Sequence, residues 1–330
     1  MTQSLTKKDF KSDQEVRWCP GCGDYSILNA VQSVCTKLGK TKDEIVFVSG
    51  IGCSSRFPYY MDTFGFHSIH GRAAAVATGV KTANPDLSVW VITGDGDGLS
   101  IGGNHTAHLL RRNLDINVIL FNNEIYGLTK GQYSPTSPQG RRTKTSPMGS
   151  VDRPFNPLSF ALGCNATFVA RTIDSHPKHL EATLQAAADH RGTSFVEVYQ
   201  NCVIFNDGAF DDVASKKIRA DRTIDLQPGQ PMIYGKEADK GLVVDGFEMK
   251  RCAAGDATVW DPTIESAAPA FQMSTLDHDH EMPNPIGIFR SVEAGVFEEG
   301  VNAQVDAAIE KKGAGTLHDL VYSGETWEIS

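Results

Sequence analysis

The chain has 330 residues and a formal net charge of -9, which disfavours non-specific binding to nucleic acid. No apolar run approaches the roughly 20 residues of a membrane span, and no N-terminal export signal is visible, so we expect a cytoplasmic protein without membrane partners. The seven cysteines then favour free thiols or metal ligands over a disulfide framework. A chain of this length can bury a full α/β core with a sizeable appendage.

Apolar segments of two kinds alternate along the first two thirds of the chain. Short β-branched runs predict buried strands, and longer stretches with apolar residues at helical spacing predict helices between them. Such alternation is typical of a doubly wound, mostly parallel sheet. We predict strands over 44–52, 87–98, 116–123, 166–171 and 194–200, and helices over 27–38, 72–84, 100–113 and 177–190.

Two segments depart from this alternation. Residues 131–158 contain five prolines among Ser, Thr and Arg, and form a loop too long to be idle in a compact domain. After residue 208 the pattern gives way to turn-rich stretches, with one further helix near 297–311. We therefore expect a cofactor-binding domain over 1–208 and an irregular C-terminal extension over 209–330, packed on the core or on a partner.

Glycines and polar residues follow three of the predicted strands, in "SGIGCS", "TGDGDG" and "FNNEIYG". In an open α/β sheet, ligands bind at the carboxyl ends of the strands. The turn from Gly94 to Gly98 leads into a helix and offers backbone N–H groups to a phosphate. Asn122 and Asn123 follow about 25 residues after Gly96 on the next strand, so a carboxylate and amide oxygens suited to Mg²⁺ meet there.

This Gly-Asp-Gly and Asn-Asn pair resembles the thiamine diphosphate motif, although a lone GDG also occurs in ordinary βα turns. The resemblance implies that Asp95, the side-chain oxygen of Asn123 and the backbone carbonyl of Ile125 hold Mg²⁺ on the diphosphate. His70 could contact the cofactor or cap a helix. The expected cofactor-binding residues are Gly52, Cys53, Ser54, His70, Gly94, Asp95, Gly96, Asp97, Gly98, Asn123, Ile125, Gly127, Leu128 and Thr129.

Four cysteines have a spacing that suits a metal centre: Cys19 and Cys22 in "CPGCG", Cys53 after 30 intervening residues, and Cys202 after 148 further intervening residues. The first pair alone permits a redox disulfide, a zinc site or an iron–sulfur site. A thioredoxin-like couple would follow a strand, and none precedes this pair. Cys35 and Cys164 are expected to be buried or incidental thiols, and Cys252 has no assigned role. His278 and His280, in "DHDHE", are typical of solvated surface.

The segments "CPGCG", "GIGCS" and "QNCVIFN", together with the thiamine motif, resemble the β subunit of 2-oxoacid:ferredoxin oxidoreductases. The resemblance covers about residues 17–210 and extends more loosely to "PNPIGIFR" near the end of the chain. It implies that Cys19, Cys22, Cys53 and Cys202 ligate one 4Fe-4S cluster. It also implies a thiamine-dependent oxidative decarboxylation of a 2-oxoacid that forms an acyl-coenzyme A. An α subunit would supply the pyrimidine-binding domain and the catalytic glutamate, in an αβ or (αβ)₂ assembly. No ferredoxin-type cysteine run is present, so ferredoxin must dock from outside.

Two cations on strand-end loops, Arg56 and Lys130, are the expected substrate-binding residues. In the family that the chain resembles, such positions face the substrate, and two cations suit a dicarboxylate such as 2-oxoglutarate better than pyruvate. Either residue could instead be a solvated cation or a contact to the α subunit. Two rival interpretations remain at this point: a cluster-free thiamine enzyme subunit, which leaves the cysteines unexplained, and a zinc-stabilised interaction subunit.

Overall fold

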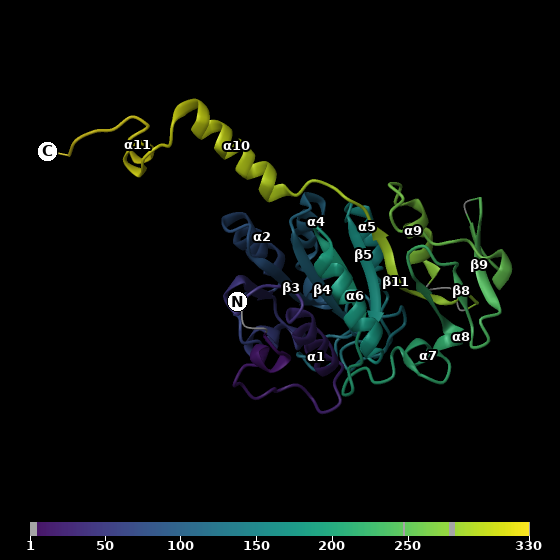
Figure 1. The fold of residues 1–330 in the computed structure, drawn as a ribbon. Helices are drawn as coiled ribbons and strands as arrows, with labels where there is room; N and C mark the ends of the chain where they lie inside the picture. Colours follow the sequence, from purple (N-terminus) through teal and green to yellow (C-terminus); the bar gives the residue numbers. More distant parts are fainter. Residues whose placement is uncertain (1–4, 247, 277–280, 330) are drawn as a thin grey trace.

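The computed structural model describes residues 5–246, 248–276 and 281–329, so His278 and His280 lie outside the described residues. A central eight-stranded sheet has the order β2-β1-β3-β4-β6-β5-β11-β7 (Figure 1). Neighbouring strands are parallel, except that β11 runs antiparallel to β5. The strands are β1 (Ile45–Ser49), β2 (Phe64–His67), β3 (Ser88–Gly94), β4 (Ile116–Asn122), β5 (Phe168–Ile173), β6 (Ser194–Tyr199), β7 (Thr223–Leu226) and β11 (Asn284–Ser291).

Helices cover both faces of this sheet, which confirms the doubly wound α/β fold. Along each central strand, alternate side chains point to opposite faces. Phe47, Trp90 and Ile119 pack with α1 (Asp24–Cys35) and α6 (Pro177–Asp189). On the other face, Val48, Val91 and Val118 pack with three further helices, α2 (Ala73–Ala83), α4 (Gly103–Arg112) and α5 (Pro157–Gly163). The short helices of the first 208 residues are α3 (Asp95–Leu99), η1 (Lys7–Phe10), η2 (Lys42–Glu44) and η3 (Ser54–Tyr60).

Part of the segment after residue 208 is more regular than its composition predicts. β7 and β11 enter the central sheet, and a second sheet of three strands has the order β10-β9-β8. Pro285 and the left-handed Gly287, with φ of 94°, lie within β11 and hide it from sequence patterns. The other elements here are β8 (Ile233–Tyr234), β9 (Lys240–Asp245), β10 (Glu248–Ala253), α7 (Asp211–Ala214), α8 (Arg219–Arg222), α9 (Ala268–Ser274) and η4 (Ala254–Asp256).

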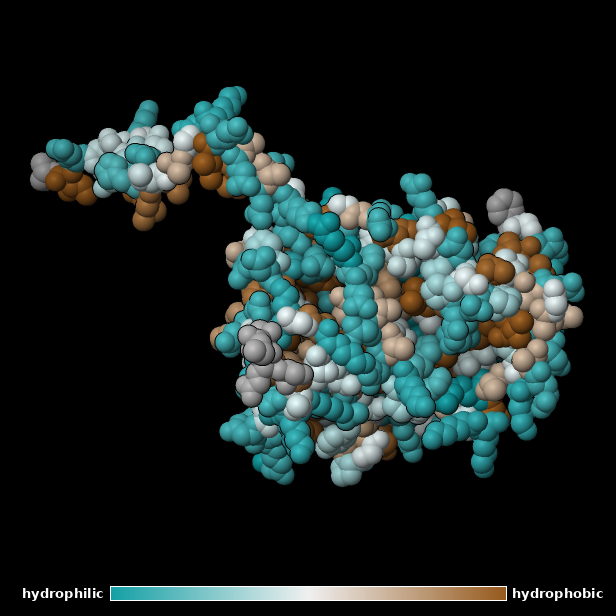
Figure 2. All heavy atoms as spheres, in the orientation of Figure 1, coloured by the Kyte–Doolittle hydropathy of each residue, from teal (hydrophilic) through white to brown (hydrophobic). Residues whose placement is uncertain are grey.

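The last elements, α10 (Phe297–Lys312) and α11 (Leu317–Val321), project away from the body of the molecule (Figure 1). Their surface carries exposed hydrophobic side chains, visible along this segment in Figure 2. Across the ranges that the structure describes, no helix combines the length and apolarity needed to cross a bilayer. The structure therefore puts the predicted helix near 297–311 in an arm that is separate from the sheet.

Candidate functional site

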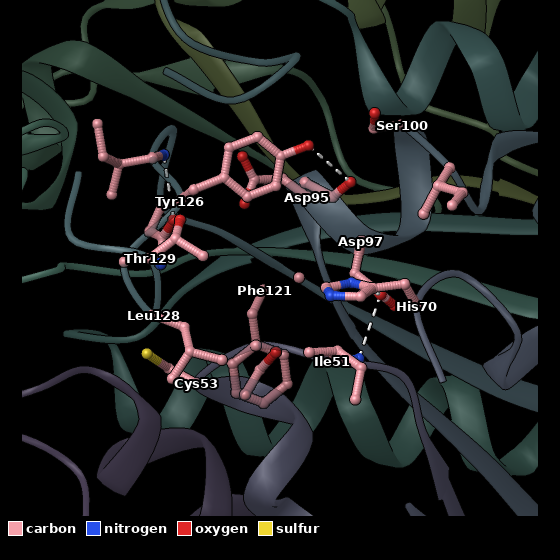
Figure 3. Close-up of a pocket in the computed structure, with 18 of the residues that line it drawn as sticks. Ile51, Cys53, His70, Asp95, Asp97, Ser100, Phe121, Tyr126, Leu128 and Thr129 are labelled. Carbon is pink, nitrogen blue, oxygen red and sulfur yellow. Dashed lines mark hydrogen bonds and ion pairs between the residues drawn. The ribbon is translucent and has the colours of Figure 1, made fainter. Parts of the chain in front are cut away.

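The carboxyl ends of three neighbouring parallel strands form one cavity of about 280 Å³. β1, β3 and β4 are adjacent in the sheet and run in the same direction, so the loops that follow them meet at one edge. We call this the first cavity, and Figure 3 shows its lining. It is lined by Asp24, Ile51, Gly52, Cys53, Ser54, His70, Gly94, Asp95, Gly96, Asp97, Ser100, Ile101, Phe121, Asn123, Ile125, Tyr126, Gly127, Leu128 and Thr129.

The structure brings together all but one of the residues expected to bind the cofactor. Gly98 does not line the first cavity, since it lies buried beneath it beside Thr93 and Leu120. His70 is 62% exposed at its side chain and reaches the cavity from the segment before α2. The loops that follow neighbouring parallel strands lie at the same edge of the sheet. The position of these residues directly after predicted strands was therefore enough to predict that they lie close together.

The glycine-rich turn after β3 is shaped by its contact with Tyr126. A Cβ on Gly96 would lie 2.1 Å from the Tyr126 ring, and the Tyr126 hydroxyl donates a hydrogen bond to the Gly96 carbonyl at 3.2 Å. Figure 3 shows this ring beside Asp95. Gly96 is therefore required for the close approach of the Tyr126 side chain from the loop after β4. This contact packs the Gly-Asp-Gly turn against the segment that follows the Asn-Asn pair.

Asp95 is one of three buried carboxylates that line the first cavity, with Asp24 and Asp97. Burial raises the pKa of this carboxyl to about 6, against the opposing effect of hydrogen bonds from Ser134 and Thr136. The Thr136 hydroxyl donates to Asp95 Oδ2 at 2.6 Å and also lies 3.0 Å from Asn122 Oδ1. The long loop 131–158 thus supplies side chains that fix Asp95, a role that the sequence did not reveal.

Asp97 lines the same cavity, yet its oxygens serve mainly to join the surrounding loops. Asp97 Oδ1 accepts hydrogen bonds from the backbone N–H groups of Gly71 at 2.8 Å and Ile51 at 3.2 Å. Its Oδ2 accepts from the Thr93 hydroxyl at 2.9 Å. The loops after β1 and before α2 are therefore tied to β3 through this one carboxylate.

A second cavity of about 280 Å³ adjoins the first and contains four thiols. Five residues line both cavities and form the wall between them: Asp24, Cys53, Asn123, Gly127 and Leu128. A Cβ on Gly127 would lie 3.6 Å from both Cys53 Sγ and Cys202 Sγ. We call this the four-thiol cavity; its lining is Arg17, Trp18, Cys19, Cys22, Asp24, Cys53, Arg56, Asn123, Gly127, Leu128, Lys130, Gln200, Cys202, Val203, Ile204 and Phe205.

The four thiols line one cavity without being grouped as the ligands of a single ion are. Among the residues that the structure describes, no three His, Cys, Asp or Glu side chains are grouped closely enough to hold one metal ion. A tetrahedral zinc site would hold all four sulfurs about 2.3 Å from the ion. Burial raises the pKa of Cys53 to about 12, so a strongly cationic group would be needed to stabilise thiolates there. The donor set fits a group larger than a single ion.

The remaining cysteines lie apart from this cavity. Cys35 is the last residue of α1 and is buried in the core, and Cys164 packs against the opposite face of the sheet. Cys252 belongs to β10 of the small sheet. The structure therefore separates the four cysteines of the predicted ligand set from the three others.

Arg56 and Lys130 line the four-thiol cavity and not the first cavity. The Arg56 guanidinium donates from Nε to the Tyr60 hydroxyl at 2.9 Å and lies 5.9 Å from the ring centroid of Tyr59. Lys130 has a φ of 75° and follows directly after Leu128 and Thr129, which line the first cavity. Lys130 thus directly follows residues of the first cavity, whereas the contacts of Arg56 with Tyr59 and Tyr60 lie outside it.

Sequence reasoning missed a buried polar chain beneath the site. Arg171 on β5 and Glu197 on β6 are register partners, and Arg171 Nε donates to Glu197 Oε2 at 2.6 Å. Glu197 Oε1 accepts from Asn122 Nδ2 at 2.7 Å, which fixes the residue beside Asn123. The sequence did carry a signal for this pair, because Arg171 and Glu197 are charged residues within two otherwise apolar strands, "FVARTI" and "SFVEVY".

Asp24 was also missed, although it follows the cysteine pair by two residues. It is buried, and its Oδ2 has no hydrogen-bond partner within the described part of the chain. Burial, with a smaller effect from Asp174, raises the pKa of this carboxyl to about 7. Nothing in its local sequence separates it from an ordinary first-turn helix residue.

Comparisons with known proteins agree with this geometry. The thiamine pyrophosphate enzyme family, C-terminal TPP binding domain, matches residues 50–198. The chain is 50% identical, over all of its length and 93% of the relative, to the 2-oxoglutarate oxidoreductase subunit KorB of Mycobacterium tuberculosis. It is 44% identical, over 73% of its length and 79% of the relative, to a 2-oxoacid:ferredoxin oxidoreductase subunit beta of Saccharolobus solfataricus.

A solved structure is also similar over almost the whole chain. It is the 2-oxoglutarate:ferredoxin oxidoreductase from Magnetococcus marinus with 2-oxoglutarate, coenzyme A and succinyl-CoA bound. The TM-score is 0.78 at 30% sequence identity, and the match covers 98% of this chain and 97% of that chain. The similarity therefore includes the segment after residue 208.

Proposed function

Because the chain belongs to the β subunits of the 2-oxoacid:ferredoxin oxidoreductases, we propose that it holds thiamine diphosphate in the first cavity and a 4Fe-4S cluster in the four-thiol cavity. The observation that carries this proposal is the shared wall of the two cavities, to which Cys53, Asp24 and Asn123 contribute. The thiamine cofactor, which holds the electrons released by decarboxylation, would then be next to a cluster that accepts them one at a time.

The first cavity has the groups that a metal diphosphate requires. We assign Asp95, the side-chain oxygen of Asn123 and the backbone carbonyl of Ile125 to Mg²⁺, because these are hard oxygen donors at one cavity wall. The turn at Gly94 and Gly96 gives backbone access for phosphate oxygens. Bound there, thiamine diphosphate would supply the nucleophile and electron sink that decarboxylation of a 2-oxoacid needs.

The four-thiol cavity supports an iron–sulfur cluster over zinc. Cys19, Cys22, Cys53 and Cys202 give the four thiolates that one 4Fe-4S cluster takes. They line a space of about 280 Å³, whereas a zinc ion would draw them together. The cluster would receive electrons from the adjacent cofactor and pass them to ferredoxin, which fits the name of the Saccharolobus relative.

The site needs a second polypeptide. Of the residues described, no glutamate lines the first cavity, so the glutamate that activates the thiamine ring is assigned to an α subunit. The names of the relatives support 2-oxoglutarate as the substrate, and the Magnetococcus structure supports coenzyme A as the acyl acceptor. We propose an αβ or (αβ)₂ enzyme that converts 2-oxoglutarate to succinyl-CoA, or runs the reverse reaction, in the cytoplasm.

The purified chain alone is expected to be inactive, whereas the chain co-purified with its α subunit reduces ferredoxin when 2-oxoglutarate and coenzyme A are supplied. The physical reason is that one diphosphate-binding domain lacks the group that activates the cofactor. Anaerobic ferredoxin reduction is the measurement, with omission of each substrate as control. Substrate-dependent reduction by the chain without a partner would overturn the two-subunit proposal.

Lys130→Ala is expected to reduce preference for 2-oxoglutarate over pyruvate in the assembled enzyme. If Lys130 pairs with the distal carboxylate, its loss costs on the order of 2 kcal/mol, or about 30-fold in kcat/KM, for 2-oxoglutarate and much less for a monocarboxylate. Arg56→Ala is the parallel variant, in which the hydrogen bond to Tyr60 is also lost. If the ratio of kcat/KM for 2-oxoglutarate to kcat/KM for pyruvate is unchanged in both variants, substrate selectivity resides in the α subunit and this assignment is wrong.

A further inference from the structure

Gln200 connects the two cavities. It follows directly after β6, and its backbone N–H donates to the Asn122 carbonyl at 2.9 Å, which extends the β4–β6 pairing by one residue. The residue is 1% exposed and lines the four-thiol cavity. The backbone of Gln200 is therefore held by the sheet, and its side chain is almost fully buried.

All the hydrogen-bonding groups of this amide are in use. Gln200 Nε2 donates to the Asn201 backbone carbonyl at 2.6 Å and lies 3.2 Å from Cys22 Sγ, to which it donates its other proton. Gln200 Oε1 accepts from Asn123 Nδ2 at 2.8 Å. A carbonyl oxygen can only accept, so Asn201 fixes which end of the Gln200 amide is nitrogen.

The orientation of Asn123 follows from this arrangement. Because Gln200 presents its oxygen, Asn123 must turn its amide nitrogen toward Gln200, and Asn123 Oδ1 is left on the other side. There Oδ1 accepts from the backbone N–H of Ile125 at 3.2 Å. Second-sphere hydrogen bonds of this kind orient metal ligands. Gln200 thus directs the oxygen that we assign to Mg²⁺.

The contact with Cys22 acts on the other centre. Hydrogen bonds to the sulfur ligands are among the factors that set the reduction potential of an iron–sulfur cluster. Reduction adds negative charge that spreads onto the sulfurs, so an N–H donor stabilises the reduced form and raises the potential. The same amide group therefore touches a ligand of each proposed cofactor.

We propose that Gln200 is a positioning residue that orients Asn123 for Mg²⁺ and raises the reduction potential of the cluster through Cys22. This inference rests on the proposed function. It predicts that two properties, metal affinity and cluster potential, are controlled by the two ends of one side chain and can be separated by substitution.

The test uses two Gln200 variants of the assembled enzyme. Gln200→Met removes the hydrogen bonds to Asn123, Cys22 and Asn201 without adding charge. It is expected to shift the midpoint potential to a more negative value and to weaken Mg²⁺ binding roughly 10- to 100-fold. Gln200→Glu keeps an acceptor for Asn123 but loses the donor to Cys22, so it is expected to lower the potential while retaining most Mg²⁺ affinity. The readouts are an EPR-monitored redox titration and Mg²⁺-dependent thiamine diphosphate binding.

Gln185→Met is the matched control, because Gln185 donates to Asp189 on α6 and lines neither cavity. A wild-type midpoint potential in Gln200→Met would overturn the inference, as would equal loss of Mg²⁺ affinity in the two Gln200 variants. If Gln200→Met loses its cluster, a wild-type midpoint potential in Gln200→Glu would overturn the inference. Absence of iron from the wild-type protein would instead contradict the proposed function, so the two failures are distinguishable.

Discussion

Serine substitution of any one thiol in the four-thiol cavity is expected to remove or destabilise the iron–sulfur cluster. The four cysteines line one space and each would ligate one iron, and a hydroxyl is a poor substitute for a soft thiolate ligand. Iron and acid-labile sulfide per chain, measured after anaerobic purification, should fall in all four variants. The Cys202 variant is the most informative, because 148 residues separate Cys202 from Cys53 and only the fold brings the two together.

The controls for this series are Cys35→Ser and Cys164→Ser, which alter thiols packed in the core clusters away from the cavity. Both should keep the wild-type iron and sulfide content. Circular dichroism should show that the ligand variants retain their secondary structure, so that cluster loss is not a consequence of unfolding. Full iron content in Cys202→Ser would be incompatible with four-thiolate ligation.

Asp95→Ala is expected to abolish thiamine diphosphate binding while leaving the cluster in place. Asp95 is the carboxylate that we assign to Mg²⁺, and it is held by Thr136 at 2.6 Å in a buried position. Without it, the remaining assigned ligands of the cation, from Asn123 and Ile125, would both be neutral oxygens, and the diphosphate would lose its bridge to the protein. Cofactor content of the purified enzyme and titration with added thiamine diphosphate and Mg²⁺ are the measurements.

Asp86→Ala is a suitable control for Asp95→Ala, because Asp86 lies at an exposed turn before β3 and lines neither cavity. The EPR signal of the reduced cluster provides the second control, since the four thiols are not ligands of Mg²⁺. Unchanged cofactor content in Asp95→Ala would refute the assignment of the metal site.

The sequence predicted the parts of the site that depend on strand order. "TGDGDG" and "FNNEIYG" follow strands that turn out to be neighbours, β3 and β4, so the residues after them had to meet. Cys53 follows β1, which pairs with β3, and it therefore reaches the same edge. These residues could be found because their positions are set by the alternation of strands and helices, which apolar periodicity reveals.

The remaining parts depend on contacts that have no local signal. Thr136 reaches Asp95 from a proline-rich loop. Gln200 contacts Cys22, which is 178 positions earlier in the sequence, and also Asn123. Likewise, β11 carries Pro285 and Gly287 and was hidden within the irregular segment after residue 208. Side-chain amides and hydroxyls are common in loops, so only the folded geometry distinguishes those that orient a ligand.

The central claim is that thiamine chemistry and electron acceptance take place side by side in this chain. The most direct measurement is the EPR spectrum of the anaerobic αβ enzyme after adding 2-oxoglutarate and coenzyme A without ferredoxin. The account predicts the signal of a reduced 4Fe-4S cluster in the wild-type enzyme and no such signal in Asp95→Ala, although that variant retains its iron. A wild-type enzyme that decarboxylates 2-oxoglutarate while its cysteines hold zinc, or while its cluster stays oxidised, would contradict the account.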